Sequence, residues 1–247
     1  MRRPNLILKA AILVLALGST LLAQQPSPPV AKPAGPTVQL SLIVTDSKNK
    51  SLNQVSKDDV HVIEDKVEQK VLSIAPDERP VDLVLAIDSS NSLRSLMRTV
   101  FEDFKKLSAD RRKVAVIITD GEDRNSHYKQ EALVKKLRES GVQIFALGLV
   151  TELDRESGLV RKSPRDKAES LLKMVTEETG GRVFFPRNRT ELLDSMTQII
   201  SDLRGQFRLT YQSSNGEKKG FKNVEVKLIS SSGEKRKAIV PRGYGSE

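Results

Sequence analysis

The apolar segment 81–87 is followed, at alternate positions, by three oxygen-bearing side chains, Asp88, Ser90 and Ser92. Alternate residues of an extended segment point the same way, so one carboxylate and two hydroxyls can converge on one point. Hard oxygen donors of this kind suit Mg²⁺, Mn²⁺ or Ca²⁺ and do not suit zinc or copper. The spacing predicts a divalent-cation site, although Asp and Ser also favour turns and helix caps.

A second apolar segment, 114–119, delivers another carboxylate, Asp120, into an acidic turn that begins Asp120-Gly121. Two apolar strands that each end in Asp are typical of a ligand crevice at the carboxyl edge of an open α/β sheet. We therefore expect a divalent cation (Mg²⁺, Mn²⁺ or Ca²⁺) to bind where the two strands end. The predicted ligands are Asp88, Ser90, Ser92 and Asp120.

The elements that must position these residues alternate between apolar runs and amphipathic segments. Strands are predicted at 82–87, 114–119, 142–147 and 182–185, and helices at 92–108, 129–140, 164–179 and 191–204. The first three strands are nearly continuous runs of Val, Ile, Leu and Ala, as expected for a parallel sheet covered on both faces. In the first helix, Leu93, Met97, Val100 and Phe104 follow the helical period. Residues 80–205 are thus predicted to form an α/β domain with a parallel sheet.

Two β regions flank this core. Segments that alternate like half-buried strands are 38–45, 59–63 and 70–74 before it, and 207–212, 223–229 and 235–240 after it. The pairs Asn215-Gly216 and Ser232-Gly233 predict hairpin turns. We expect 38–79 and 206–247 to join into one small β region built from both ends of the chain, and two separate sheets would refute this.

The start of the chain predicts export. Arg2, Arg3 and Lys9 precede an apolar run at 10–23 that is too short for a comfortable membrane span. We expect a signal peptide at 1–23, a Pro-rich linker at 24–37, and a mature protein without a stable membrane span, in the periplasm or outside the cell. An uncleaved N-terminal anchor is the alternative.

Composition excludes several classes of function. The 247 residues contain no cysteine, which rules out disulfides, thiolate catalysis and Cys-ligated metals. The net charge of +9 falls to +6 when the three basic residues of the signal peptide are removed, and the basic runs are short and lack interleaved aromatics. We therefore expect no nucleic-acid partner. The two histidines, His61 and His127, are far apart and suggest no catalytic set, so we expect no enzyme.

The core resembles a von Willebrand factor type A domain. The metal-ion-dependent adhesion site of that family is written DxSxS after the first strand, then a distant Thr, then an Asp in a (T/S)DG turn. Residues 88–92 match the first part and residues 119–121 match the last. The resemblance implies a doubly wound, Rossmann-like fold.

The flanking pieces resemble one subgroup, the acidobacterial von Willebrand factor A-related proteins. That subgroup has an export signal, a strand pair with a phrase like residues 62–70 here, and a C-terminal RxGY ending, for which this chain has Arg242-Gly243-Tyr244. The resemblance covers roughly residues 38–245.

The chain departs from the family in the spacing of its two aspartates. Asp88 and Asp120 are 32 residues apart, much closer than in the family, and the missing stretch would hold two strands and the loop with the metal-binding Thr. Thr99 cannot replace that Thr, since it lies about two turns along the predicted helix. The usual strand order 3-2-1-4-5-6 would shrink to 1-4-5-6. The first strand would become an exposed apolar edge, so an edge-strand dimer is expected as one mode of association.

In the family, the cation keeps one coordination position for a Glu or Asp of a partner. The resemblance implies an exported protein-binding module of the adhesion type, with an acidic side chain on its protein ligand, and the lost hydroxyl predicts weaker, more hydrated cation binding. Two alternatives stay open. One is a Mg²⁺-dependent hydrolase of the haloacid-dehalogenase type with Asp88 as nucleophile, although Ser90 stands where that motif needs an acid. The other is a degenerate scaffold that binds no metal.

Overall fold

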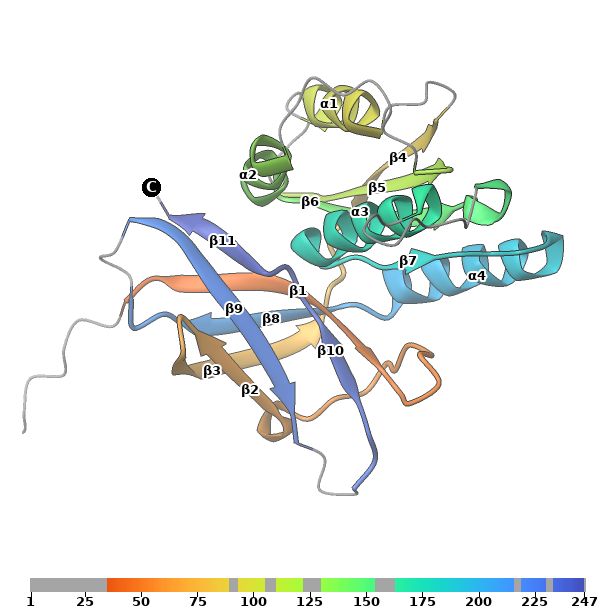
Figure 1. Cartoon of the computed structure of the whole chain (residues 1–247). Helices are drawn as coiled ribbons and strands as arrows, with labels where there is room; N and C mark the ends of the chain where they lie inside the picture. Colours follow the sequence, from red (N-terminus) through yellow and green to blue (C-terminus); the bar gives the residue numbers. More distant parts are fainter. Residues whose placement is uncertain are drawn as a thin grey trace, which may run out of the picture. The chain divides into compact units, whose positions relative to one another are not determined.

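Two β-sheets organise the chain, one parallel and one antiparallel (Figure 1). The computed structural model describes residues 35–88, 93–104, 110–121, 130–153, 163–215, 219–229 and 233–246. Both sheets belong to one compact unit, residues 34–247. The predicted signal peptide and most of the predicted linker lie outside the described residues.

The parallel sheet has, among the described residues, four strands in the order β4-β5-β6-β7. Their bounds are Val81–Ile87, Arg112–Thr119, Val142–Gly148 and Val183–Phe184. Every residue of β6 is buried, as expected for a strand covered on both faces. The order is the one predicted for the core, with its first strand at an edge, and the predicted α/β fold class is confirmed.

Helices cover both faces of the parallel sheet. They are α1 (Leu93–Phe104), α2 (Gln130–Ser140), α3 (Pro164–Thr179) and α4 (Arg189–Arg204). Helices α1, α2 and α3 share one face, where Met97 and Leu172 belong to the same buried cluster as Ile144. Helix α4 covers part of the opposite face, where Ile199 clusters with Phe145. This placement agrees with the amphipathic pattern that predicted the helices.

Local capping chemistry sets the ends of the last two helices. The Ser163 side chain accepts from the Asp166 backbone N–H and the Asp166 carboxylate accepts in return, which forms a capping box, and Gly180 ends α3 in the left-handed conformation. Helix α4 begins at Arg189, two residues before the predicted start, because the Asn188 side chain caps it.

The antiparallel sheet has seven strands in the order β10-β1-β8-β3-β2-β9-β11 within the described part of the chain. Their bounds are Lys237–Ile239, Thr37–Thr45, Phe207–Gln212, Val67–Pro76, Val60–Glu64, Gly220–Leu228 and Gly243–Ser246. This sheet contains strands from both ends of the chain, so the predicted joint β region is confirmed. Only residues 240–242 separate β10 from β11, so one stretch of chain forms both outer strands of the sheet.

The two predicted hairpins are wrong. Strand β8 pairs with β1 and β3, so no side of it remains for β9, and Asn215-Gly216 does not join paired strands. Strand β9 pairs with β2 and β11, so Ser232-Gly233 does not lead into a hairpin with β10. In both cases pairing between distant segments overrides a local turn signal. Strand β11 was not predicted, because its sequence is rich in glycine and lacks alternation.

A buried carboxylate ties the C-terminal strand to the N-terminal strands. Glu64 is fully buried, and its Oε2 accepts from the hydroxyls of Tyr211 at 2.7 Å and Tyr244 at 2.9 Å. Its Oε1 accepts from the Ser213 hydroxyl at 2.6 Å. Burial alone would raise the pKa of Glu64, but these hydrogen bonds outweigh it and hold the pKa below its ordinary value. The segment 62–70 and the ending 242–244 therefore meet, one through Glu64 and the other through Tyr244.

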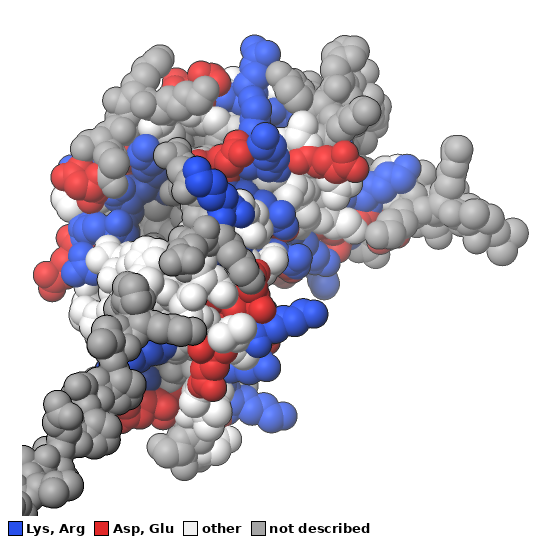
Figure 2. All heavy atoms as spheres, turned by 90° about the vertical axis from the view of Figure 1, so that its left-hand side faces the viewer, with Lys and Arg blue, Asp and Glu red and all other residues white. Residues whose placement is uncertain are grey.

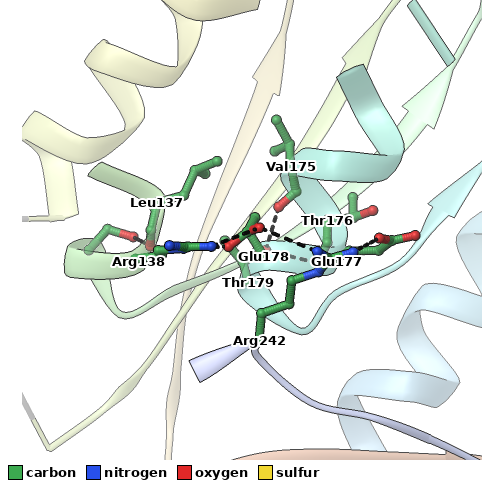
Figure 3. A network of polar contacts seen from close by, with 9 residues as sticks. Leu137, Arg138, Val175, Thr176, Glu177, Glu178, Thr179 and Arg242 are labelled. Atoms are coloured by element: carbon green, nitrogen blue, oxygen red, sulfur yellow. Dashed lines mark hydrogen bonds and ion pairs between the residues drawn. The ribbon is translucent and has the colours of Figure 1, made fainter. Parts of the chain in front are cut away.

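Arg242 attaches the same ending to the α/β core (Figure 3). Its guanidinium contacts Glu177 at 2.6 Å and Glu178 at 3.8 Å, both at the end of α3. Glu178 is only 5% exposed and also pairs with Arg138 of α2 at 2.7 Å. A Cβ at position 243 would lie 1.9 Å from the carbonyl oxygen of Lys222, so this position requires glycine. Each residue of Arg242-Gly243-Tyr244 thus has a structural role.

The surface mixes charges of both signs. Figure 2 shows Lys and Arg interspersed with Asp and Glu over the face in view. Among the described residues, no helix combines the length and apolarity that crossing a membrane requires.

Candidate functional site

Strands β4 and β5 end side by side. Ile87 lies opposite Ile118, and the Asp88 N–H donates to the Ile118 carbonyl oxygen at 2.8 Å. Strand β5 ends one residue later at Thr119, and Asp120 follows it. The structure therefore places Asp88 and Asp120 at the adjacent ends of two neighbouring parallel strands, where ligand crevices of α/β sheets form.

The Thr119 hydroxyl connects the two strand ends. It donates to Oδ2 of Asp88 at 2.8 Å and accepts from the Gly121 N–H at 2.8 Å. Thr119 is only 2% exposed, so water does not compete for these bonds. The hydroxyl therefore fixes the direction of the Asp88 carboxylate and the start of the turn after β5.

The turn after β5 requires glycine. Gly121 has a φ of 75°, and a Cβ there would lie 3.0 Å from the Ala168 Cβ and 3.1 Å from the Leu172 Cδ1. The turn is thus packed against α3. On its other side, the Leu149 N–H donates to the Thr119 carbonyl oxygen at 2.8 Å, which links the ends of β5 and β6. These contacts explain the Asp-Gly pair and hold Asp120 beside the end of β4.

The predicted site residues divide into two groups. Asp88 and Asp120 are partly buried at the strand ends, whereas Ser90 and Ser92 lie outside the described residues, so the four-ligand set stays a prediction. Sequence reasoning missed the contact of Thr119 with Asp88. The signal for it was the Thr of the Thr-Asp-Gly turn, which sits directly across from Asp88 once the two strands are paired in register.

A hollow lies away from the strand ends, between α2 and the strands β9 and β11. Its lining includes Arg138, Phe221 and Tyr244, and it includes neither Asp88 nor Asp120. The Arg138 guanidinium lies 4.0 Å from the centre of the Phe221 ring, a cation–π contact. Arg138 also pairs with Glu178, so this hollow is lined by groups that hold the helices and strands together.

Comparison with known families gives one match, and it lies in the α/β core. The model of the von Willebrand factor type A domain matches residues 91–199. This stretch of the chain is similar to a von Willebrand factor type A domain. The match includes Ser92 and Asp120 and begins after Asp88 and Ser90. Neither curated proteins nor solved structures gave a match to the chain.

The similarity to the von Willebrand factor type A domain would imply a divalent cation at this edge, and the side chains present can be checked for whether they fit one. Two carboxylates, Asp88 and Asp120, stand at the adjoining strand ends, and no cluster of three or more His, Cys, Asp or Glu side chains occurs in the described ranges. Mg²⁺ typically uses one or two carboxylates and keeps several waters, so this sparse oxygen set fits it. A tightly caged ion with many protein ligands would not fit. The remaining donors would be water and the hydroxyls of Ser90 and Ser92.

Proposed function

We propose that the protein is an exported, non-enzymatic binding module whose von Willebrand factor A domain engages an acidic side chain of a partner protein through a divalent cation. The domain class is generally used for protein interaction and adhesion. The observation that carries the proposal is the pair of adjacent strand ends with Asp88, Thr119 and Asp120 in register.

The chemistry at these strand ends favours an external carboxylate. A dication held by few protein charges supplies an electrophilic coordination position that attracts an anionic oxygen. Asp88 and Asp120 would hold the ion, and Ser90 and Ser92 would add hydroxyl oxygens. Thr119 would act indirectly, because its hydrogen bond already fixes the Asp88 carboxylate. Residues that hydrogen-bond to metal-ligating side chains commonly tune the affinity for the metal ion, because they orient those side chains.

The proposal also includes a subgroup of the family and a shortened core. We assign the chain to the acidobacterial von Willebrand factor A-related proteins, with a core shortened between Asp88 and Asp120. Support comes from the 32-residue spacing of the two aspartates and from the bond between Glu64 and Tyr244, which joins the two subgroup motifs. The basic and apolar start of the chain supports export.

The proposal is tested with acetate as the probe for a carboxylate ligand. Mn²⁺ bound to the protein relaxes the methyl protons of acetate only when acetate reaches the bound ion. We expect addition of the full chain to enhance acetate relaxation beyond the effect of free Mn²⁺. Asp88→Asn should abolish the enhancement. Asp82→Asn serves as the matched control, because it removes a carboxylate at the opposite end of β4, where Asp82 pairs with Arg111. Equal relaxation with wild type and Asp88→Asn would refute the proposed function.

A further inference from the structure

The outer strands of the two sheets differ in length among the described residues. In the antiparallel sheet, the outer strands β10 and β11 have only three and four residues. In the parallel sheet, β7 has only two residues, and short edge strands offer little to a partner. Strand β4 has seven residues and, among the described residues, pairs with β5 alone. It is therefore a long edge strand with one open side.

The open strand is also apolar on one face. Leu83, Leu85 and Ile87 are 56%, 58% and 65% exposed, and their alternate positions place them on the same face of the sheet. Ala86 points to the other face, where it belongs to the buried cluster that includes α1. Long, apolar edge strands are the ones that pair with other chains, and β4 carries no Lys or Pro that would prevent this.

The backbone groups that face the open side can be assigned. The Asp88 N–H donates to β5, and the Pro80 carbonyl accepts from the Arg112 N–H. Even-numbered residues of this strand therefore direct their N–H and C=O groups toward β5. Because these directions alternate along a strand, Leu83 and Leu85 direct theirs outward, together with the other odd-numbered residues.

We propose that two copies of the chain form a two-fold dimer in which β4 pairs antiparallel with β4 of the second copy, extending the parallel sheet to eight strands. Val84 faces Val84 of the second copy on the two-fold axis. Leu83 then faces Leu85, and Val81 faces Ile87. In this register all the outward backbone groups of β4 face outward groups of the second copy, and the exposed apolar side chains form one continuous ladder.

Neighbouring registers are less favourable. Only shifts of two residues keep outward groups opposite outward groups. A shift that places Leu85 opposite Leu85 brings Asp82 opposite Asp88 of the second copy, and like charges directly opposite are destabilising. A shift in the other direction places Leu83 opposite Leu83 and leaves Ile87 beyond the end of the paired strand. The centred register is therefore the one that the sequence of β4 favours.

A second copy fits this edge because a two-fold interface requires the same patch to be complementary to itself. Strand β4 meets that requirement because it presents outward N–H and C=O groups along its length and exposed apolar side chains at alternate positions. Its paired length is about 23 Å at roughly 3.3 Å per residue. An interface of two strands lies at the low end of the areas of stable complexes, so the dimer should dissociate on dilution. It would also place the two Asp88 residues at opposite ends of the pair.

Disulfide trapping tests the register, because the chain has no cysteine of its own. Val84→Cys in the full chain should form a disulfide-linked dimer on mild oxidation, since directly facing, non-hydrogen-bonded strand positions have Cα atoms about 4.5 Å apart, within disulfide range. Leu85→Cys probes the shifted register. Leu193→Cys, at a position with a similar exposure of 54% on α4, is the matched control for contacts through the helix face. Strong trapping of Leu85→Cys or Leu193→Cys, with none of Val84→Cys, would overturn the proposal.

A second variant tests the pairing without cysteine chemistry. Leu85→Pro removes one outward N–H and leaves the ladder to β5 intact, because residue 85 does not donate to β5. Light scattering should show a concentration-dependent dimer for the full wild-type chain and at least a tenfold weaker dimer for Leu85→Pro with an unchanged circular dichroism spectrum. A monomeric wild type at every concentration, or equal dimerisation of a folded Leu85→Pro, would show that the edge does not pair.

Discussion

Thr119→Val removes a single hydroxyl group and nearly preserves the shape of the side chain. Two hydrogen bonds are lost at the end of β5, the one that Thr119 donates to Asp88 and the one that it accepts from the Gly121 N–H. Since Thr119 is 2% exposed, no water molecule can take the place of the missing hydroxyl without a rearrangement. The variant therefore keeps the Asp88 carboxylate and removes only the hydrogen bond that orients it.

The expected loss of stability in Thr119→Val follows from how deeply each hydrogen-bond partner of Thr119 is buried. A hydrogen bond to a charged group is worth about 1.5–3 kcal/mol, but Asp88 is partly exposed and regains water, so the lower end applies. The orphaned Gly121 N–H, in a buried residue, adds about 1 kcal/mol. We expect a total loss of roughly 2–3 kcal/mol in the free energy of unfolding, which for a chain of this size lowers Tm by roughly 4–12 °C.

Two assays check this prediction. Urea unfolding without added cation should show the stability loss for Thr119→Val, while Thr119→Ser, which keeps the hydroxyl, should lose less than about 1 kcal/mol. Titration with Mn²⁺ should show a roughly 10–100-fold weaker affinity for Thr119→Val, the usual effect of losing a group that orients a metal ligand. If Thr119→Val unfolds at the same urea concentration as wild type, the hydroxyl does not join the two strand ends and the reasoning is wrong.

Further predictions concern the C-terminal motif. Tyr244→Phe should cost about 2 kcal/mol in urea unfolding, because a buried carboxylate loses one of its donors; an unchanged midpoint would contradict the contact. Glu64 has a lowered pKa, so its contribution is present above the ordinary Glu pKa and is lost as the pH falls through the lowered value. Glu64→Gln should therefore be less stable at neutral pH and lose less on acidification, and parallel pH–stability curves would refute this. Arg242→Met should cost less than about 1 kcal/mol, since its ion pair with Glu177 is largely exposed and its contact with Glu178 is long, at 3.8 Å; a loss as large as that of Tyr244→Phe would contradict this ranking.

Much of the α/β core follows from its sequence pattern. The helical stripe of Leu93, Met97, Val100 and Phe104 is buried as predicted, and the apolar runs form the sheet in the predicted order. These elements are predictable because each buries a face that its own periodicity defines. The exposure of Leu83 also follows from the expected edge position of the first strand.

Features that depend on distant pairing were not predictable in the same way. A turn pair such as Asn215-Gly216 favours a local hairpin, yet β8 lies between β1 and β3, which come from the other end of the chain. Thr119 reaches Asp88 only because β4 and β5 pair in register, and the sequence does not fix that register. Glu64 and Tyr244 meet for the same reason, since β11 lies beside β9, and β9 lies beside β2.

Calorimetric titration of the full chain with Mg²⁺ or Mn²⁺ tests the central claim most directly. The account predicts saturable binding of one ion per chain by wild type and by the control Asp82→Asn. Asp88→Asn and Asp120→Asn should each weaken binding by at least tenfold. Absence of saturable binding by wild type, or equal affinity of Asp88→Asn and wild type, would contradict the claim that the adjoining ends of β4 and β5 hold a cation.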